Sequence, residues 1–164
     1  MPGHFVNGLP EKHTDPMTNQ SGPASSQPLN STRAPEPVGA YPHARRVGNL
    51  LFLSGVGSRD AATNNIPGAE FDSAGNLVSY DMEAECHSVF TNVRNIVEDA
   101  GLDWKDIVDV TVFLTNMQDD FETYNRIYAE YFADTRPCRT TVEVGALPTE
   151  IAIELKVVAQ FPSE

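Results

Sequence analysis

The spacing of apolar residues predicts a hairpin followed by a helix at the start of the folded region. Apolar-rich runs lie on both sides of Gly48 and Asn49, a residue pair that favours the tight turn of a β-hairpin. Residues 56–76 are rich in Gly, Asn, Asp and Pro and are typical of a loop. Between residues 79 and 101, apolar residues recur every three or four positions, which predicts an amphipathic helix. Ser79 or Asp81 can cap its start, Glu83 and Glu85 suit the positive end of its dipole, and Gly101 ends it.

The second half of the chain repeats the alternation of strands and helices. Residues 106–116 alternate apolar and polar positions, which predicts a strand with Val108, Val110, Val112 and Leu114 on its core face. Residues 119–132 place aromatic side chains, among them Tyr124 and Tyr128, along one stripe of a second helix, and we interpret this stripe as core packing. Two further strands, joined by "GALPTE", are predicted to form a closing hairpin over residues 138–160.

The resulting element order is ββαβαββ, which predicts an α+β fold with one mixed sheet and both helices on one face. The other face of the sheet is then left without a covering layer. In a domain of this size such a face is commonly covered by another copy of the chain. We therefore expect a homo-oligomer.

Residues 1–37 have a different composition, with seven of the twelve prolines and few large apolar residues. A segment of this kind buries too little apolar surface to offset its conformational entropy. The sequence therefore predicts a disordered Pro/Ser-rich tail over residues 1–37 and one domain over residues 38–164.

Charge and cysteine content limit the binding partners and the cellular location that we expect for this chain. The net charge is −12, and residues 41–164 hold 20 of the 23 acidic side chains. Such a domain repels phosphate backbones, so nucleic acid is not an expected partner. No apolar run is long enough to suggest a membrane span. Cys86 and Cys138 lie far apart without a metal-binding spacing, so we expect no metal and a cytoplasmic location, with a mitochondrial one left open.

Two charged residues in the last two strands are candidates for chemistry. Side-chain alternation, with Val144 paired to Ile151, predicts that Arg139 and Glu154 share the helix-free face within reach of each other. The same alternation predicts that Cys138 faces the core. Arginine can grip a carboxylate through two parallel hydrogen bonds, and a nearby glutamate can hold water or relay protons. This pair suits a small anionic carboxylate substrate attacked by water. A cross-strand ion pair without a catalytic role is the alternative interpretation.

Several stretches resemble one known family in order and spacing. They are "VGNLLFLSG", "NIVEDAGLDWKDIVDVTVFLTNMQDDFETYNRIYAEYF", "PCRTTVEVGALP" and "IAIELKVVA", which together resemble the reactive intermediate deaminase family, also called Rid or YjgF, over roughly residues 38–160. The resemblance implies a chorismate-mutase-like fold, a homotrimer with active sites in inter-subunit clefts, and hydrolysis of enamines or imines to ketones and ammonia without a metal or organic cofactor.

The resemblance also assigns site residues. Arg139 matches the family arginine that binds the substrate carboxylate, and Glu154 matches the glutamate that positions or activates water. Tyr41, Gly55 and Asn125 fall at pocket positions, although Asn125 is equally consistent with a capping or surface amide. Thr141 stands where many members have cysteine, which makes it a substrate-binding candidate.

A narrower resemblance connects the pattern P-H-x-x-R-V-G-x-x-x-F-x-S-G-x-x-S-R with the 2-aminomuconate deaminases. It implies conversion of 2-aminomuconate to 2-oxo-3-hexenedioate and ammonia. A substrate with two carboxylates needs a second cation, for which Arg59 is the candidate, with Arg45 or Arg46 behind it. A solvated loop arginine without a binding role is the alternative interpretation of Arg59, and the role of His43 is left open. The alternatives are a general 2-imino acid deaminase and a non-catalytic trimer that binds small metabolites.

Overall fold

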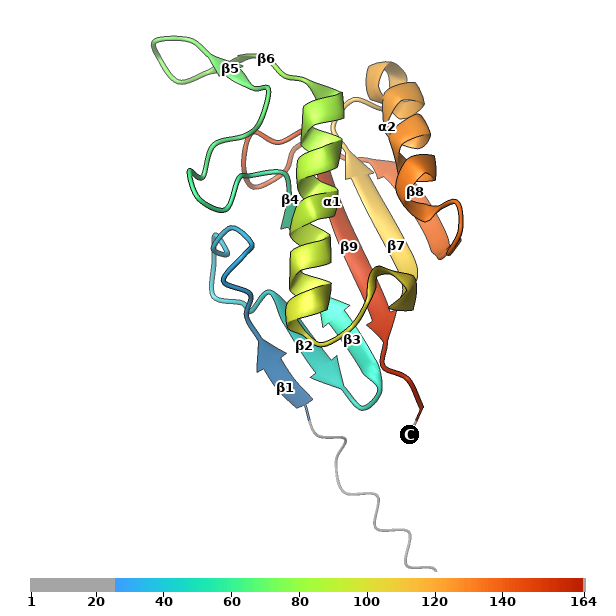
Figure 1. The fold of residues 1–164 in the computed structure, drawn as a ribbon. Coiled ribbons are helices and arrows are strands. Elements are labelled where there is room, and N and C mark those ends of the chain that lie inside the picture. The colour runs from blue at the N-terminus through green and yellow to red at the C-terminus, as the bar shows by residue number, and fades with distance from the viewer. Residues whose placement is uncertain (1–25, 164) are drawn as a thin grey trace, which may run out of the picture.

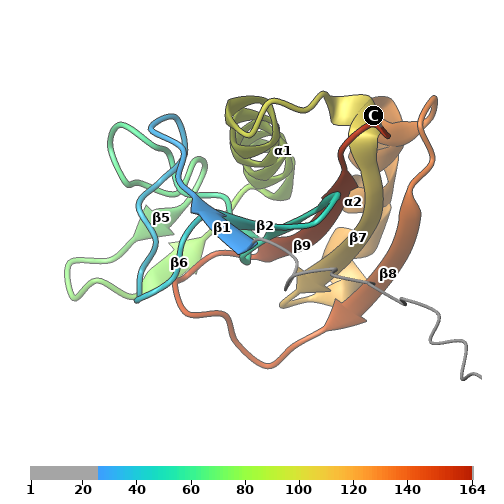
Figure 2. The ribbon, with the colours of Figure 1, turned by 90° about the horizontal axis from the view of Figure 1, so that it is seen from below.

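Two helices cover one face of a mixed β-sheet in the computed structural model, which describes residues 26–163 (Figure 1). The sheet has the order β1-β2-β3-β9-β7-β8, with β4 also paired to β9, and it curves around the helices when seen from below (Figure 2). A second, two-stranded sheet joins β5 to β6. The α+β architecture expected from the sequence is confirmed.

The elements follow one another in this order: β1 (Ser26–Leu29), β2 (Ala44–Val47), β3 (Leu50–Leu53), β4 (Val56–Gly57), β5 (Glu70–Phe71), β6 (Leu77–Ser79), α1 (Met82–Asp99), the 3₁₀ turn η1 (Trp104–Asp106), β7 (Ile107–Leu114), α2 (Met117–Phe132), β8 (Cys138–Glu143) and β9 (Ile153–Gln160). The predicted hairpin is β2 with β3, and the two predicted helices are α1 and α2. Strands β4, β5 and β6 lie in or beside the segment expected to be a loop.

Helix α1 begins and ends where the sequence predicts. The Asp81 side chain accepts a hydrogen bond from the Ala84 backbone N–H at 3.1 Å, which satisfies one of the free donors of the first turn. Gly101 follows the helix with φ +85°, a conformation that glycine adopts without strain. The residues of α1 that face the core include Cys86, Val89, Phe90, Val93 and Val97.

One prediction for β7 is wrong at a single residue. The pairing between β7 and β9 shifts by one residue between Ile107 and Asp109, a β-bulge. Because the extra residue disturbs the alternation, Val108 is exposed instead of core-facing, while Val110 and Val112 are fully buried as predicted. Strict alternation cannot anticipate such an insertion.

The closing hairpin is also a wrong prediction. Strand β8 pairs in parallel with β7, whereas β9 pairs antiparallel with the other edge of β7. Strands β7 and β8 are joined through α2, and a parallel pair requires such a crossover. The connection from residue 143 to residue 153 passes the end of β7, and it is longer than the 2–5 residues of a usual hairpin turn.

The predicted tail divides into two parts. Residues 1–25 lie outside the described residues. Residues 26–37 belong to the fold, so the predicted boundary at residue 37 is wrong: β1 pairs antiparallel with β2, and Arg33 forms ion pairs with Glu98 and Asp99 on α1. Composition missed this order because main-chain pairing and ion pairs, rather than a large apolar surface, hold the segment.

Within residues 26–163 no helix is long and apolar enough to cross a membrane. The same residues contain no group of three or more potential metal ligands. Both cysteines are free; Cys86 is buried, and Cys138 is exposed although the sequence predicted it to face the core.

Candidate functional site

Arg139 lies on β8 and faces helix α2. Its Cζ is 4.8 Å from the ring centroid of Tyr128 and 5.6 Å from that of Tyr124, and its Nη1 donates a 2.8 Å hydrogen bond to Asn125 Oδ1. Among the described residues no carboxylate forms an ion pair with it. An exposed guanidinium held over two rings, without a carboxylate partner, is suited to bind a carboxylate ligand.

Asn125 and Thr141 join the same cluster. Asn125 orients Arg139 rather than capping a helix. The hydroxyl groups of Thr141 and Tyr124 lie 3.1 Å apart, and burial raises the pKa of Tyr124, which keeps its hydroxyl protonated at neutral pH. Three of the expected site residues, Arg139, Thr141 and Asn125, thus form what we call the arginine half-site.

Glu154 lies on the opposite face of the sheet. Its neighbours in β9, Ile153 and Leu155, are fully buried in the core beneath the helices, so the alternation of the strand turns Glu154 away from them. Burial raises the pKa of the Glu154 carboxyl, with no hydrogen bond or charge among the described residues to lower it. A carboxyl whose pKa is raised toward neutrality is suited to exchange protons with a substrate.

The prediction that Arg139 and Glu154 share one face is therefore wrong. Across the sheet, Arg139 pairs with Val110, which is buried beneath the helices, whereas Glu154 pairs with Phe113 on the other face. Every residue of edge strand β8 is exposed or half-buried, so its sequence has no buried apolar side that would define its orientation. Within one chain the two side chains do not meet.

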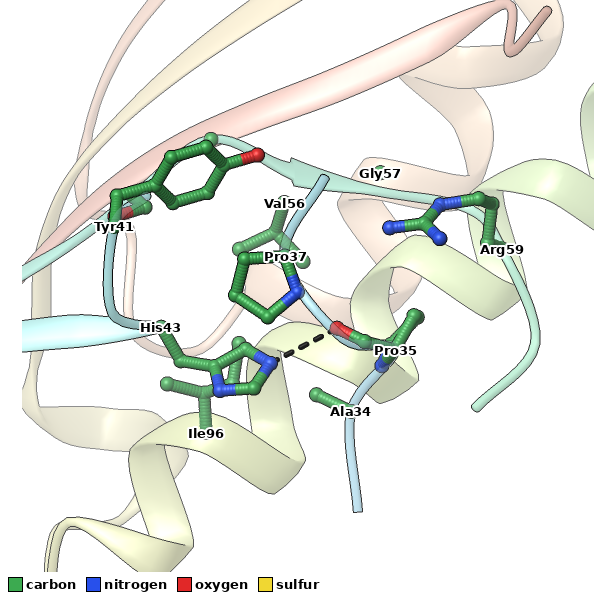
Figure 3. Close-up of a pocket in the computed structure, with 11 residues that line it drawn as sticks. Ala34, Pro35, Pro37, Tyr41, His43, Val56, Gly57, Arg59 and Ile96 are labelled. Atoms are coloured by element: carbon green, nitrogen blue, oxygen red, sulfur yellow. Dashed lines mark hydrogen bonds between the residues drawn. The ribbon is translucent and has the colours of Figure 1, made fainter. Parts of the chain in front are cut away.

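Tyr41, Gly55 and Arg59 line one pocket, which Glu154 itself does not line. Figure 3 shows the Tyr41 ring and the Arg59 guanidinium entering this pocket from opposite sides. Arg59 donates hydrogen bonds to the Glu36 carbonyl at 2.8 Å and to Asn64 Oδ1, and among the described residues it forms no ion pair. Both acceptors are neutral, so the charge of Arg59 stays available to an anion.

Two glycines connect this pocket to Glu154. A Cβ at Gly55 would collide with the Glu154 carboxyl, and Gly57 pairs directly with Glu154 between β4 and β9. Both glycines also line the pocket. Tyr41, Gly55, Arg59 and Glu154 thus form what we call the glutamate half-site.

His43 has a structural role. It is buried, its Nδ1 accepts a hydrogen bond from the Ser31 N–H at 3.1 Å, and its Nε2 lies 2.9 Å from the Pro35 carbonyl. Because a backbone N–H can only donate and a carbonyl can only accept, the ring is neutral with its proton on Nε2. His43 holds residues 31–35 against β2 (Figure 3).

Sequence reasoning missed three features of the site. Pro35 and Pro37, placed in the expected tail, form a wall of the pocket. Tyr124 and Tyr128, interpreted as core packing, also support Arg139; their spacing of four residues on a helix that precedes the arginine was the available signal. Lys156, two residues beyond Glu154 on the same face, has its pKa lowered by burial and donates a hydrogen bond to the Leu53 carbonyl.

Comparisons with known proteins agree on one family. The family described as Endoribonuclease L-PSP matches residues 31–161. The chain is 34% identical to Reactive Intermediate Deaminase A, chloroplastic, of Arabidopsis thaliana, over 88% of this chain and 72% of that protein. It is 31% identical to a 2-iminobutanoate/2-iminopropanoate deaminase of Dermatophagoides farinae, over 78% of this chain and 91% of that protein.

Among solved structures, the crystal structure of E. coli TdcF with bound serine is similar with a TM-score of 0.72 and 29% identity, covering 83% of this chain and 99% of that one. The match to the Endoribonuclease L-PSP family begins at residue 31, inside the segment that the sequence assigned to the tail. This chain therefore belongs to the Endoribonuclease L-PSP family, the family of the reactive intermediate deaminases.

Proposed function

We propose that this protein hydrolyses the C=N bond of small enamine or imine carboxylates, releasing ammonia and a 2-oxo acid without a cofactor. The observation that carries the proposal is the pair of complementary half-sites. One presents a cation oriented by aromatic rings and free of any carboxylate among the described residues, and the other presents a carboxyl whose pKa is raised by burial. The names of two relatives in this family support the same reaction class.

A complete site requires a second copy of the chain. Arg139 and Glu154 lie on opposite faces of one sheet, so both can reach one substrate only when the arginine half-site of one copy meets the glutamate half-site of another. The helix-free face also exposes apolar side chains, among them Phe52 and Val142. A surface of this kind favours association, and a closed homotrimer is the arrangement that we propose.

In the proposed mechanism, Arg139 of one copy holds the substrate carboxylate next to the reacting carbon. An enamine substrate first tautomerises to the imine. Ionised Glu154 of the neighbouring copy removes a proton from water as the water oxygen bonds to the imine carbon, and the nitrogen takes a proton from solvent to give a neutral carbinolamine. Glu154 then returns its proton to nitrogen, the C–N bond breaks to release ammonia, and the hydroxyl proton returns to solvent as the ketone forms. Water and imine are converted in equal amounts to ketone and ammonia.

For the substrate, we propose 2-aminomuconate, with Arg59 binding the second carboxylate. The support is that Arg59 lines the pocket beside Glu154 and bonds only neutral acceptors among the described residues. The alternative is a general 2-imino acid deaminase, for which Arg59 has no role; the name of the Dermatophagoides farinae relative favours this alternative.

Arg59→Gln separates the two substrate proposals. If Arg59 binds a second carboxylate, the variant raises KM for 2-aminomuconate by about 10–100-fold, since a hydrogen bond to a charged group contributes about 1.5–3 kcal/mol. Turnover of 2-iminopropanoate, which has one carboxylate, stays within about twofold by the same reasoning. The measurement follows ammonia release from both freshly generated compounds.

Arg45→Gln is the matched control, because Arg45 is an exposed arginine on β2 that bonds Ser26 outside the pocket. Equal KM values for Arg59→Gln and the wild type with 2-aminomuconate would contradict the dicarboxylate proposal. Failure of the wild type to turn over either compound would instead favour a metabolite-binding trimer.

Gly55→Ala tests whether the position of Glu154 matters. The added methyl group collides with the Glu154 carboxyl and displaces it, so kcat is expected to fall at least about tenfold, as small displacements of reacting groups cause. Gly145→Ala is the control, because a Cβ there meets no atom within 4 Å. Wild-type kcat in Gly55→Ala would show that the Glu154 carboxyl can move without consequence.

A further inference from the structure

Helix α1 carries a row of polar side chains on the face that packs against β4 and the start of β9. Glu85, Ser88 and Asn92 are spaced three and four residues apart, which places them on one side of the helix. Glu85 is fully buried and Asn92 is 4% exposed. Buried polar groups are usually hydrogen-bonded, and all three of these side chains bond the same short segment, although Glu85 Oε1 has no partner among the described residues.

The bonds hold three consecutive backbone carbonyls. Asn92 Nδ2 donates to the Gly57 carbonyl at 2.9 Å and to the Arg59 carbonyl at 2.8 Å. Ser88 Oγ donates to the Ser58 carbonyl at 2.6 Å. The helix therefore fixes the main chain of residues 57–59 at every carbonyl.

Glu85 extends the same contact to the strand that carries Glu154. Its Oε2 accepts hydrogen bonds from Ser58 Oγ at 2.7 Å and from the Ala152 N–H at 2.9 Å. One carboxyl oxygen thus joins the segment after β4 to the segment that enters β9. Ala152 stands two residues before Glu154, and Gly57 pairs with Glu154 across the strands.

We propose that Glu85, Ser88 and Asn92 are positioning residues, which act through residues 57–59 and Ala152 to fix Glu154 and Arg59 in the site. Apolar side chains could fill the same space on α1, but they could not set the position of individual carbonyls. The hydrogen bonds do so, and they position two residues of the glutamate half-site, Glu154 and Arg59, from one rigid helix. This inference rests on the proposed function, since it assigns Glu154 and Arg59 their roles there.

The test compares variants that remove these bonds with one that only loosens the core. Asn92→Leu keeps a side chain of similar shape but loses both donors, and Ser88→Ala loses its donor, whereas Ser88→Thr keeps the hydroxyl. Val93→Ala removes fully buried methyl groups from the same helix and touches none of these bonds. Each variant is assayed with 2-iminopropanoate well below its melting temperature, so that the folded fraction is close to one in every sample.

We expect kcat to fall at least about tenfold in Asn92→Leu and Ser88→Ala, by the sensitivity of catalysis to small displacements, and to recover in Ser88→Thr. Val93→Ala is expected to keep kcat within about twofold of the wild type, even if its melting temperature falls as far as that of Asn92→Leu. Equal kcat values in Asn92→Leu, Val93→Ala and the wild type would overturn the positioning proposal. Glu154→Gln distinguishes this failure from failure of the proposed function. An inactive Glu154→Gln together with a fully active Asn92→Leu rejects the positioning role alone. A fully active Glu154→Gln rejects both the positioning role and the proposed function.

Discussion

Glu154→Gln is expected to lower kcat by about 10²–10⁴-fold, the range that general acid–base catalysis supplies, while the KM for a 2-imino acid changes little. Glutamine keeps the shape of the side chain and can still hold water, but it cannot accept and return a proton. Single-turnover and steady-state assays of ammonia release measure the loss. Glu122→Gln, which removes an exposed glutamate of α2, is the charge-matched control. Unchanged kcat in Glu154→Gln would exclude Glu154 from the chemistry.

The same variant is expected to be more stable than the wild type at neutral pH. Because burial raises the pKa of Glu154 in the folded state, folding favours its protonated form. That contribution is fully present below the usual glutamate pKa, about 4.3, and is lost as pH rises through the raised folded-state value. The free energy of unfolding of Glu154→Gln should therefore exceed that of the wild type by an amount that grows from acidic toward neutral pH. Denaturant titrations across this range measure it, and a difference independent of pH would contradict the raised pKa.

Arg139→Ala is expected to reduce kcat/KM by about 10²–10⁴-fold, because two hydrogen bonds to a charged carboxylate contribute about 3–6 kcal/mol together. Arg139→Lys keeps the charge but loses the planar pair of donors, so it should recover only part of the activity. Steady-state kinetics with 2-iminopropanoate measure both variants.

Arg94 offers a matched control for the arginine variants. Its Cζ lies 5.0 Å from the ring centroid of Trp104, so it is a second arginine stacked on an aromatic ring, but it belongs to neither half-site. Arg94→Ala should keep kcat/KM within about twofold of the wild type, as expected for a surface substitution. A wild-type kcat/KM in Arg139→Ala would reject the carboxylate-binding role.

Local patterns in the sequence were enough to predict the helices and the first hairpin. The caps at Asp81 and Gly101 and the turn at Gly48 are short-range signals, and each occurs where it was expected. Arg139 and Glu154 were also recognisable as charged residues within predicted strands. The physical reason is that each of these features depends on residues close together in the chain.

Features that depend on distant pairings could not be predicted in this way. The alternation of β8 does not reveal whether its neighbour is β7 or β9, and the wrong neighbour gave the wrong face for Arg139. Likewise, the order of residues 26–37 depends on pairing with β2 and on ion pairs between Arg33 and α1, which lie far along the chain. The sequence predicts for Glu85 only a favourable interaction with the helix dipole, and the fold places it, with Ser88 and Asn92, against residues 57–59.

Complementation between two inactive variants tests the shared site most directly. Arg139→Ala and Glu154→Gln chains with different tags are co-expressed, and assemblies that carry both tags are purified. In a closed trimer each cleft would take Arg139 from one copy and Glu154 from its neighbour, so a mixed trimer contains about one intact cleft in three. The mixed assemblies are expected to recover about one third of wild-type kcat, while each variant alone stays inactive. Mixed assemblies as inactive as either variant alone would contradict a site built from two copies of the chain.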